Sequence, residues 1–385
     1  MATDIFISAG EASGDRYGGL LAEALRRLEP GIRLRGIGAA QMRAAGVELV
    51  ANSSAWSAIG LLDAVRIALG RMGEPRRIRR VLADDPPNVL VLIDFGAFNV
   101  PLARFARWRS VPTLYEMPPG AWSRQRPAGD LPEIVDAIAT PFEWSAQRLA
   151  VGKAHVELIG HPCLDYVGTT RTAEQAAAAF GLDPGRPVIA LVPGSRRHEI
   201  ERIAPRIFAA AAQIARELPG SQFLVPVAPT VDREPVMRLA LAQLRAADLR
   251  LLDGMDYDAL QLANVAIATS GTATLELACL GVPMVVVYRV PWATDLQFRL
   301  GRVLRQGIRW FALPNLLADR KVVPELAQAS FTPKRAAAEA LRLLQDATAA
   351  SAMRRDLAQV RQLLGPSGAS ERVAEMVMAL ARSGR

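Results

Sequence analysis

The 385-residue chain contains only two cysteines, Cys163 and Cys279, and only three histidines. Two cysteines are too few for a disulfide framework, and no histidine stands at metal-ligand spacing from either of them. The cysteine content therefore fits a reducing cytoplasm, and we expect no metal site built from cysteine and histidine.

Aromatic residues make up only 6% of the chain, which is too few for a protein that binds single strands by stacking. No zinc finger, RNP-like sequence or homeodomain-like helix is present, so we expect no nucleic-acid partner. The formal net charge is +8, and it comes mostly from arginine. Such a charge suits phosphate or an anionic membrane surface, although high-GC genomes also encode arginine-rich proteins.

No apolar run approaches the roughly 20 residues that a transmembrane helix needs. No basic region with a hydrophobic core precedes the first predicted strand, so the sequence predicts a cytoplasmic protein. Two basic amphipathic stretches, Leu61 to Met72 with the arginines at 76, 77, 79 and 80 and Trp292 to Phe311, could lie at the cytoplasmic face of the inner membrane. The alternative is that each packs on the core with a solvated arginine face.

Short β-branched runs alternate with Ala/Leu/Arg stretches of helical period, which is typical of βαβ units and parallel sheets. The predicted strands fall into two series. The first series is Ile5 to Ala9, Leu34 to Ile37, Val89 to Ile93, Thr113 to Glu116, Ala137 to Thr140 and Val156 to Ile159. The second series is Val188 to Val192, Gln222 to Val227, Leu249 to Leu252, Val265 to Ala268 and Met284 to Val287.

The two series predict an α/β protein with two Rossmann-like doubly wound domains. We expect a first domain at 1–170, a second at 171–345, and C-terminal helices at 346–385 that pack back on the first domain. Residues 166–186 are polar and look like the connection between the halves. Ligands bind at the carboxyl ends of the strands in such sheets, so the cleft that the domains face is the expected site.

The first predicted strand ends in a small-residue loop that runs from Ser8 to Asp15 and then opens a helix. Small residues let the backbone approach a ligand, and a helix start offers free amides to an anion. The loop lacks the lysine of a Walker A motif and does not match the dinucleotide fingerprint. Glu11 and Asp15 are candidate acceptor-side residues, and an ordinary tight turn is the alternative.

Two further loops of this kind follow strands of the second series. Gly194, Ser195 and Arg196 combine a turn that can cradle phosphate with a cation, although solvated arginines near a helix start are the alternative. Ser270, Gly271 and Thr272 offer hydroxyls and amides, and Glu276 one turn later can accept both hydroxyls of a ribose or close a capping box. Together the loops predict a nucleoside diphosphate ligand.

The run Asp256, Tyr257, Asp258 matches the DxD pattern of metal-dependent transferases. It lies just past a strand and before a helical run, so we interpret it as helix capping. His161 is interpreted as a packed or hydrogen-bonding residue.

Several motifs in this order resemble lipid-A-disaccharide synthases. They are Ser8 to Asp15, Gly36 to Gly38 with Met42 and Gly46, Gly160 to Pro162 with Asp165, Pro193 to Ile200, Ser270 to Glu276, Leu313 to Leu317 with Val322 to Leu326, and Ala369 to Arg372. The resemblance implies a GT-B glycosyltransferase without a cofactor or metal, whose second domain holds a UDP-sugar donor. It places Asn315 near the donor sugar.

The resemblance also implies the reaction. UDP-2,3-diacylglucosamine gives its sugar to 2,3-diacylglucosamine 1-phosphate, and UDP and a β-1,6 disaccharide are formed. The partners are then a UDP-sugar and an acylated sugar phosphate, and the oligomeric state is left open.

Two segments depart from the family pattern. The family typically has two aspartates before Phe-Asn, the second being its expected base, whereas this chain has Asp94 and then Ala97 before Phe98 and Asn99. The usual Ser-Pro and Trp-Ala-Trp segment is replaced by Met117 to Ser123. Three explanations stay open: Asp94 or Glu11 is the base, the acceptor differs, or the chain is a silent nucleotide-binding paralogue. A UDP-sugar epimerase or another GT-B transferase is the enzyme alternative.

Overall fold

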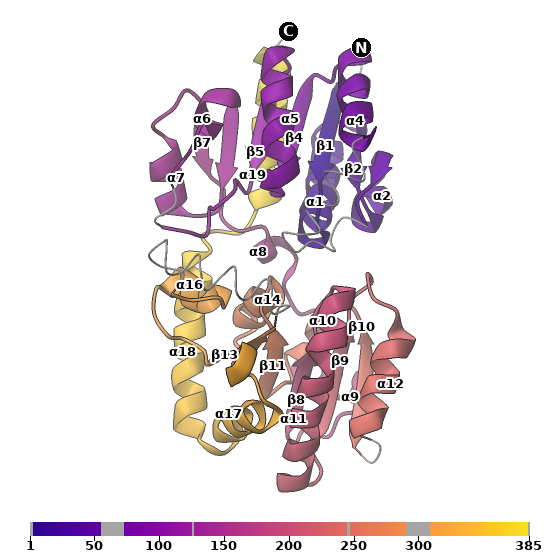
Figure 1. The fold of residues 1–385 in the computed structure, drawn as a ribbon, viewed down its shortest axis with the longest axis vertical. Coiled ribbons are helices and arrows are strands. Elements are labelled where there is room, and N and C mark those ends of the chain that lie inside the picture. The colour runs from indigo at the N-terminus through magenta and orange to yellow at the C-terminus, as the bar shows by residue number, and fades with distance from the viewer. Residues whose placement is uncertain (1–2, 55–72, 125–126, 245–246, 290–308, 384–385) are drawn as a thin grey trace. The chain divides into compact units, whose positions relative to one another are not determined.

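A computed structural model describes residues 3–54, 73–124, 127–244, 247–289 and 309–383. The chain divides into two compact units, Met1–Asp165 with Leu364–Arg385 and Tyr166–Leu363. Each unit contains one sheet of parallel strands with helices packed against it (Figure 1). The α/β class with two Rossmann-like units is confirmed.

The first unit has a seven-stranded sheet in the order β3-β2-β1-β4-β5-β6-β7. All its pairings are parallel, and β4 (Val89–Ile93) is buried along its whole length because helices cover such sheets. The strand order reverses between β1 and β4, which makes the carboxyl ends of these two strands the expected ligand position. The other strands are β1 (Asp4–Ala9), β2 (Arg33–Gly38), β3 (Glu48–Asn52), β5 (Thr113–Glu116), β6 (Ala137–Thr140) and β7 (His155–Leu158).

Helices of the first unit connect its strands, and the last helix returns to them. Helix α19 (Ala369–Ser383) packs on α1 (Ala12–Leu28), and the Arg27 and Glu371 side chains form an ion pair of 2.7 Å between these helices. The remaining helices are α2 (Ala40–Ala44), α4 (Gly73–Asp84), α5 (Gly96–Trp108), α6 (Leu131–Ile134), α7 (Glu143–Leu149) and α8 (Cys163–Tyr166), which ends at the unit boundary.

The second unit repeats the pattern with a six-stranded sheet in the order β10-β9-β8-β11-β12-β13. Its order reverses between β8 and β11. The strands are β8 (Val188–Val192), β9 (Gln222–Val227), β10 (Asp248–Asp253), β11 (Val265–Thr269), β12 (Met284–Tyr288) and β13 (Glu325–Ala327). The helices are α9 (Ala173–Phe180), α10 (Arg197–Arg202), α11 (Ala204–Glu217), α12 (Arg233–Gln243), α13 (Tyr257–Leu260), α14 (Ala273–Cys279), α16 (Leu313–Ala318), α17 (Pro333–Gln345) and α18 (Ala347–Leu363), with the 3-10 turn Gln328–Ser330.

Two expectations about the connections between the halves are wrong. Residues 166–186 are not only a linker, because they contain α9, which begins with a Thr172–Gln175 capping box and packs on α13. The expected C-terminal segment 346–385 is divided: α18 packs on α14, α16 and α17 of the second unit, and only the chain from Leu364 onward belongs to the first.

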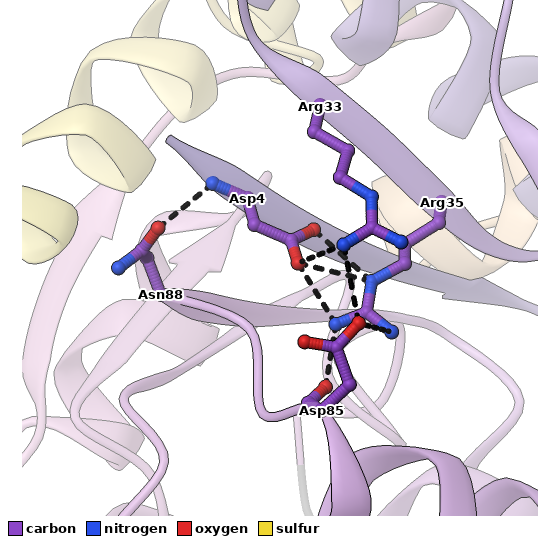
Figure 2. Close-up of polar contacts among 5 residues, drawn as sticks. All are labelled: Asp4, Arg33, Arg35, Asp85 and Asn88. Atoms are coloured by element: carbon purple, nitrogen blue, oxygen red, sulfur yellow. Dashed lines mark hydrogen bonds and ion pairs between the residues drawn. The ribbon is translucent and has the colours of Figure 1, made fainter. Parts of the chain in front are cut away.

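An ion-pair network lies at the amino ends of β1 and β2, away from the strand ends where ligands bind (Figure 2). The Arg35 side chain is only 4% exposed and contacts Asp4 at 2.8 Å and Asp85 at 3.2 Å. Arg33 contacts the same two carboxylates but is 48% exposed. The Asn88 side chain accepts a hydrogen bond from the Asp4 backbone N–H at 2.8 Å. The network joins β1, β2 and the end of α4.

Candidate active site

Glu11 and Asp94 flank the point where the strand order of the first sheet reverses. Glu11 comes two residues after β1, and Asp94 comes directly after the neighbouring β4. Gly10 lets the two turns approach, because a Cβ at this position would lie 2.1 Å from the Phe95 ring. The fold therefore brings these two predicted residues to one place.

The turn that carries Asp94 has a strained backbone. Asp94 has φ 46° and Phe95 has φ 45°, both in the left-handed region that non-glycine residues rarely occupy. Such residues cost about 1 to 3 kcal/mol each and persist only where their surroundings hold them. Strain of this kind clusters at functional sites, which supports a role for Asp94.

A buried side chain, that of Asn99, holds this turn in place. Its amide nitrogen donates to the carbonyl oxygens of Ile93 and Asp94, both at 3.0 Å. Its oxygen accepts from the Ser8 hydroxyl at 2.7 Å, which ties the turn to β1. The Tyr115 hydroxyl adds a bond of 2.7 Å to the Asp94 carbonyl oxygen. Two neighbouring strands and α5 thus fix the position of Asp94.

The environment of Asp94 suits a general base. Burial raises the pKa of this carboxyl group to about 6, and the negative charge of Glu11 adds to the shift. A carboxylate with a pKa near the working pH is a stronger base than an ordinary aspartate, and it is still ionised at neutral pH.

Asp15, a predicted acceptor-side residue, has a structural task in the described contacts. Its carboxylate accepts from the backbone N–H groups of Ala39 at 2.5 Å, Gln41 at 2.9 Å and Met42 at 3.2 Å. The side chain is buried at the start of α2. It caps that short helix, and both of its carboxylate oxygens accept hydrogen bonds there.

A second carboxyl group, Glu116, ends β5 beside Asp94, whose backbone N–H donates to the Glu116 carbonyl oxygen at 3.0 Å. Its side chain is only 2% exposed, and its Oε2 has no hydrogen-bond partner among the described residues. Burial raises the pKa of Glu116 to about 8, and Asp165 adds to the shift. The group is therefore protonated at neutral pH.

His161 is buried near Asp165 as well. Its Nδ1 accepts from the Cys163 backbone N–H at 3.1 Å, which puts the proton of the neutral ring on Nε2. Burial lowers the pKa of His161 to about 3, although Asp165 opposes this shift. The interpretation of His161 as a packed, hydrogen-bonding residue is confirmed.

Glu116→Gln is expected to change how stability depends on pH. The folded pKa of about 8 lies above the usual value of about 4.3, so between these values the native state binds more protons than the unfolded state. Stability then falls as pH rises, by at most about 1.4 kcal/mol per pH unit. Urea unfolding from pH 5 to 8.5 should show a flatter curve for the variant. Parallel curves would mean that Glu116 titrates normally.

The predicted phosphate loop Gly194 to Arg196 lies after β8, at the point where the strand order of the second sheet reverses. Its amides are already occupied, because the buried Glu199 carboxylate accepts from the backbone N–H groups of Ser195 at 2.9 Å and Arg196 at 3.1 Å. Gly194 makes room for this contact, since a Cβ there would lie 2.5 Å from Glu199. The loop therefore presents the Arg196 guanidinium, which also contacts Glu199 at 3.2 Å, rather than an empty nest of amides.

The predicted phosphate loop Ser270 to Thr272 follows β11. This strand is the neighbour of β8 at the point where the strand order of the second sheet reverses. The Ser270 hydroxyl donates to the Phe311 carbonyl oxygen at 2.7 Å, and the Thr274 hydroxyl donates to the Gly271 carbonyl oxygen at 2.7 Å. A Cβ on Gly271 would meet no atom within 4 Å, so its backbone faces open space. Gly271 and the neighbouring Thr272 are thus placed where a ligand can approach the backbone.

Glu276 lies one turn into α14, nearly buried, with both of its oxygens in hydrogen bonds. Oε1 accepts from the Tyr166 hydroxyl at 3.0 Å, and Oε2 accepts from the Tyr257 hydroxyl at 3.1 Å. The two tyrosines hold the carboxylate in a fixed orientation. Each carboxylate oxygen of an ionised glutamate can accept more than one hydrogen bond.

Asn315 is fully buried, and its side chain is saturated within the second unit. Its nitrogen donates to the Val323 carbonyl oxygen and to Glu325, both at 2.9 Å. Its oxygen accepts from the N–H groups of Val322 at 2.6 Å and Val323 at 2.8 Å. The side chain joins α16 to the segment before β13, and a direct contact with a sugar would break one of these bonds.

The interpretation of the DxD-like run as helix capping is confirmed for Asp256, whereas Asp258 binds the segment before α9. Asp256 accepts from the Ala259 backbone N–H at 3.0 Å at the start of α13. The Asp258 carboxylate accepts from the backbone and hydroxyl of Thr170 at 2.7 and 2.6 Å. Among the residues that the structure describes, no group of three or more His, Cys, Asp or Glu could hold a metal ion.

Comparison with known proteins points to one family. A sequence model described as lipid-A-disaccharide synthetase matches residues 5–378. A lipid-A-disaccharide synthase of Geobacter sulfurreducens is 38% identical over 380 residues, covering 97% of this chain and 96% of the relative. One from Nitrosococcus oceani is 33% identical and covers 98% and 96%. The chain belongs to the lipid-A-disaccharide synthase family.

Solved structures show the same fold at much lower sequence identity. A UDP-GlcNAc 2-epimerase from Neisseria meningitidis, bound to UDP-GlcNAc, is 13% identical with a TM-score of 0.62, and covers 98% of this chain and 100% of its own. A calicheamicin glycosyltransferase is 17% identical with a TM-score of 0.59, and covers 100% and 99%. These likenesses support the GT-B fold alone.

The departure from the family pattern at position 97 lies in the first turn of α5. Ala97 is exposed there, three residues after Asp94. Asn99, the next motif residue, is fully buried and holds the Asp94 turn. This member of the lipid-A-disaccharide synthase family therefore keeps Asn99, which holds the turn, and Asp94, the first of the two aspartates that the resemblance implies.

Sequence reasoning missed the residues that position others. Nothing in the sequence indicated that Glu199, Tyr166 and Tyr257 position other groups, because their hydrogen-bond partners come together only in the folded chain. Glu116 had one: it is a carboxylate at the end of a predicted buried strand, Thr113 to Glu116. Charged residues are rarely fully buried without a reason, so this position could have been singled out.

Proposed function

We propose that this chain transfers 2,3-diacylglucosamine from UDP to 2,3-diacylglucosamine 1-phosphate, giving UDP and a β-1,6 disaccharide phosphate. The observation that carries the proposal is the placement of the predicted loops at both reversal points, in a member of the lipid-A-disaccharide synthase family. Such reversal points are where doubly wound sheets bind nucleotides.

Asp94 is the proposed base. It removes the proton from the acceptor hydroxyl while that oxygen forms a bond to the anomeric carbon. The bond from this carbon to the diphosphate breaks, and its electron pair leaves with UDP, so the configuration inverts. The strained turn and the raised pKa of Asp94 support this role. Glu11 tunes the pKa of Asp94, and Asp15 keeps the neighbouring loop in place.

The second unit is the proposed donor site. Arg196 contacts the diphosphate together with the backbone of Gly271 and Thr272, while Gly194, Ser195 and Ser270 shape the two loops. Glu276 accepts the ribose hydroxyls in the orientation that Tyr166 and Tyr257 give it. Asn315 contributes by positioning α16. Arginine and loop amides stabilise the leaving diphosphate, so no metal or other cofactor takes part.

Contact with the membrane is proposed through the first unit. Among the described residues, no helix has the length and hydropathy needed to cross a bilayer. Helix α4 presents exposed arginines at 76, 77, 79 and 80. Such a helix suits anionic headgroups at the cytoplasmic face of the inner membrane. The stretch Leu61 to Met72 and nearly all of Trp292 to Phe311 lie outside the described residues.

The rival functions are less well supported. The lipid-A-disaccharide synthases of Geobacter sulfurreducens and Nitrosococcus oceani are 38% and 33% identical to this chain, whereas three epimerase structures of the same fold are 12 to 14% identical. A silent paralogue has no need for a carboxylate held in a strained turn with a raised pKa.

The test is UDP release from UDP-2,3-diacylglucosamine in detergent and chelator, with and without the acceptor. Release that depends on the acceptor and is unaffected by chelator is expected. Tight UDP binding without release under either condition would favour a silent paralogue. Release that is abolished by chelator would overturn the metal-independent mechanism.

A further inference from the structure

Among the described residues, the edge of the first unit that we propose for substrate binding carries little positive charge. In the described residues of the loops that directly follow its seven strands, Arg124 is the only lysine or arginine. The same loops carry the carboxylates Glu11 and Asp94. A substrate with a phosphate group would be repelled here unless a cation compensates. The position of Arg124 is therefore informative.

The Arg124 guanidinium is stacked on the ring of Trp144. The guanidinium carbon lies 3.9 Å from the centre of the Trp144 ring. Trp144 is itself stacked on Phe142, with ring centres 4.7 Å apart and an angle of 5° between the planes. The indole N–H of Trp144 donates to the Ala121 carbonyl oxygen at 2.9 Å, so the Trp144 ring is fixed to the loop that carries Arg124.

That loop is held from α7 as well. The Arg148 guanidinium donates to the carbonyl oxygens of Ser123 at 2.5 Å and Gly120 at 3.2 Å. The residue before Arg124 is thus anchored while the Arg124 side chain remains exposed. An arginine fixed in this way loses little conformational entropy when it binds a ligand.

Stacking engages the flat face of a guanidinium and leaves its N–H groups directed outward in the plane. In that plane an arginine binds phosphate with two parallel hydrogen bonds. We propose that Arg124, carried on Trp144, binds the phosphate of the acylated sugar phosphate acceptor. This inference rests on the proposed function, because it assigns a residue to the acceptor named there.

The test compares binding of two short-chain acceptors, 2,3-diacylglucosamine with and without the 1-phosphate, by calorimetry. Arg124→Ala should weaken binding of the phosphorylated acceptor by about 10- to 100-fold and leave the other unchanged, because hydrogen bonds to charged groups are worth about 1.5 to 3 kcal/mol. Arg124→Lys should recover part of the loss. Arg104→Ala, at an exposed arginine on α5 that pairs with Asp130, is the matched control and should change neither.

Equal weakening for both acceptors, or none for the phosphorylated one, would overturn the assignment. Turnover is measured separately from binding. Phosphate-dependent binding through Arg124 without UDP release would therefore refute the proposed reaction but not the role of Arg124. The melting temperature of each variant shows whether it is folded.

Discussion

Asp94→Asn is expected to lower kcat by about 10²- to 10⁴-fold, the usual contribution of a general base. The donor KM and the affinity for UDP should stay within about twofold of the wild type, because the nucleotide contacts that we propose are in the second unit. The asparagine keeps the size and backbone bonds of the turn, so the loss reports on proton transfer. Steady-state kinetics and UDP titration measure the two quantities.

The pH profile of the wild type should show the same group. With the pKa of Asp94 at about 6, kcat/KM should fall below pH 6 as this carboxylate is protonated. Glu11→Gln removes the neighbouring negative charge that raises this pKa, so the acid limb should move to lower pH. An Asp94→Asn variant that keeps more than half of the activity would contradict the assignment of the base.

Arg35→Met is expected to destabilise the protein by about 3 kcal/mol. Its guanidinium is the buried centre of the network in Figure 2, and its removal leaves Asp4 and Asp85 with the exposed Arg33 as their one ion-pair partner among the described residues. Breaking a buried ion pair from one side typically costs about 3 to 5 kcal/mol. Urea unfolding gives the free energy.

Arg33→Met is the matched control, because it contacts the same two carboxylates at the surface. An exposed pair of this kind contributes about 0 to 1 kcal/mol. Both variants should keep kcat under stabilising conditions, since the network lies at the amino ends of the strands. Equal losses of stability would show that burial is not what distinguishes the two arginines.

The sequence predicted the sheets well because their strands are buried. Val89–Ile93 and Val188–Val192 are apolar runs, and the structure gives these two strands and Thr113–Glu116 the expected bounds. Two edge strands, β3 (Glu48–Asn52) and β13 (Glu325–Ala327), were missed. Each is short and only partly buried, so it lacks the apolar run that marks a central strand.

Positions of the site residues followed from topology, whereas their contacts did not. Loops that follow parallel strands meet at one edge, so Glu11 and Asp94 could be placed together in advance. The saturation of Asp15 and Asn315 could not, because their partners, such as the Ala39 and Val323 backbones, are fixed only by folding. The same holds for Glu199, which accepts a hydrogen bond from a backbone amide in the loop that was expected to bind phosphate.

Because the exposed Ala97 carries no carboxylate, transfer depends on the carboxylate that remains, that of Asp94. The Asp94 turn is held by Asn99 and Tyr115 independently of any side chain at position 97. We therefore expect the frame of the site to be competent as it stands.

The most direct measurement is the mass spectrum of the lipid product from purified wild-type protein, UDP-2,3-diacylglucosamine and 2,3-diacylglucosamine 1-phosphate. We expect a disaccharide phosphate whose mass equals the summed masses of the two substrates less the mass of UDP. Free diacylglucosamine together with UDP would contradict this expectation. So would unchanged substrates in an assay in which another enzyme of the family, run as a positive control, is active.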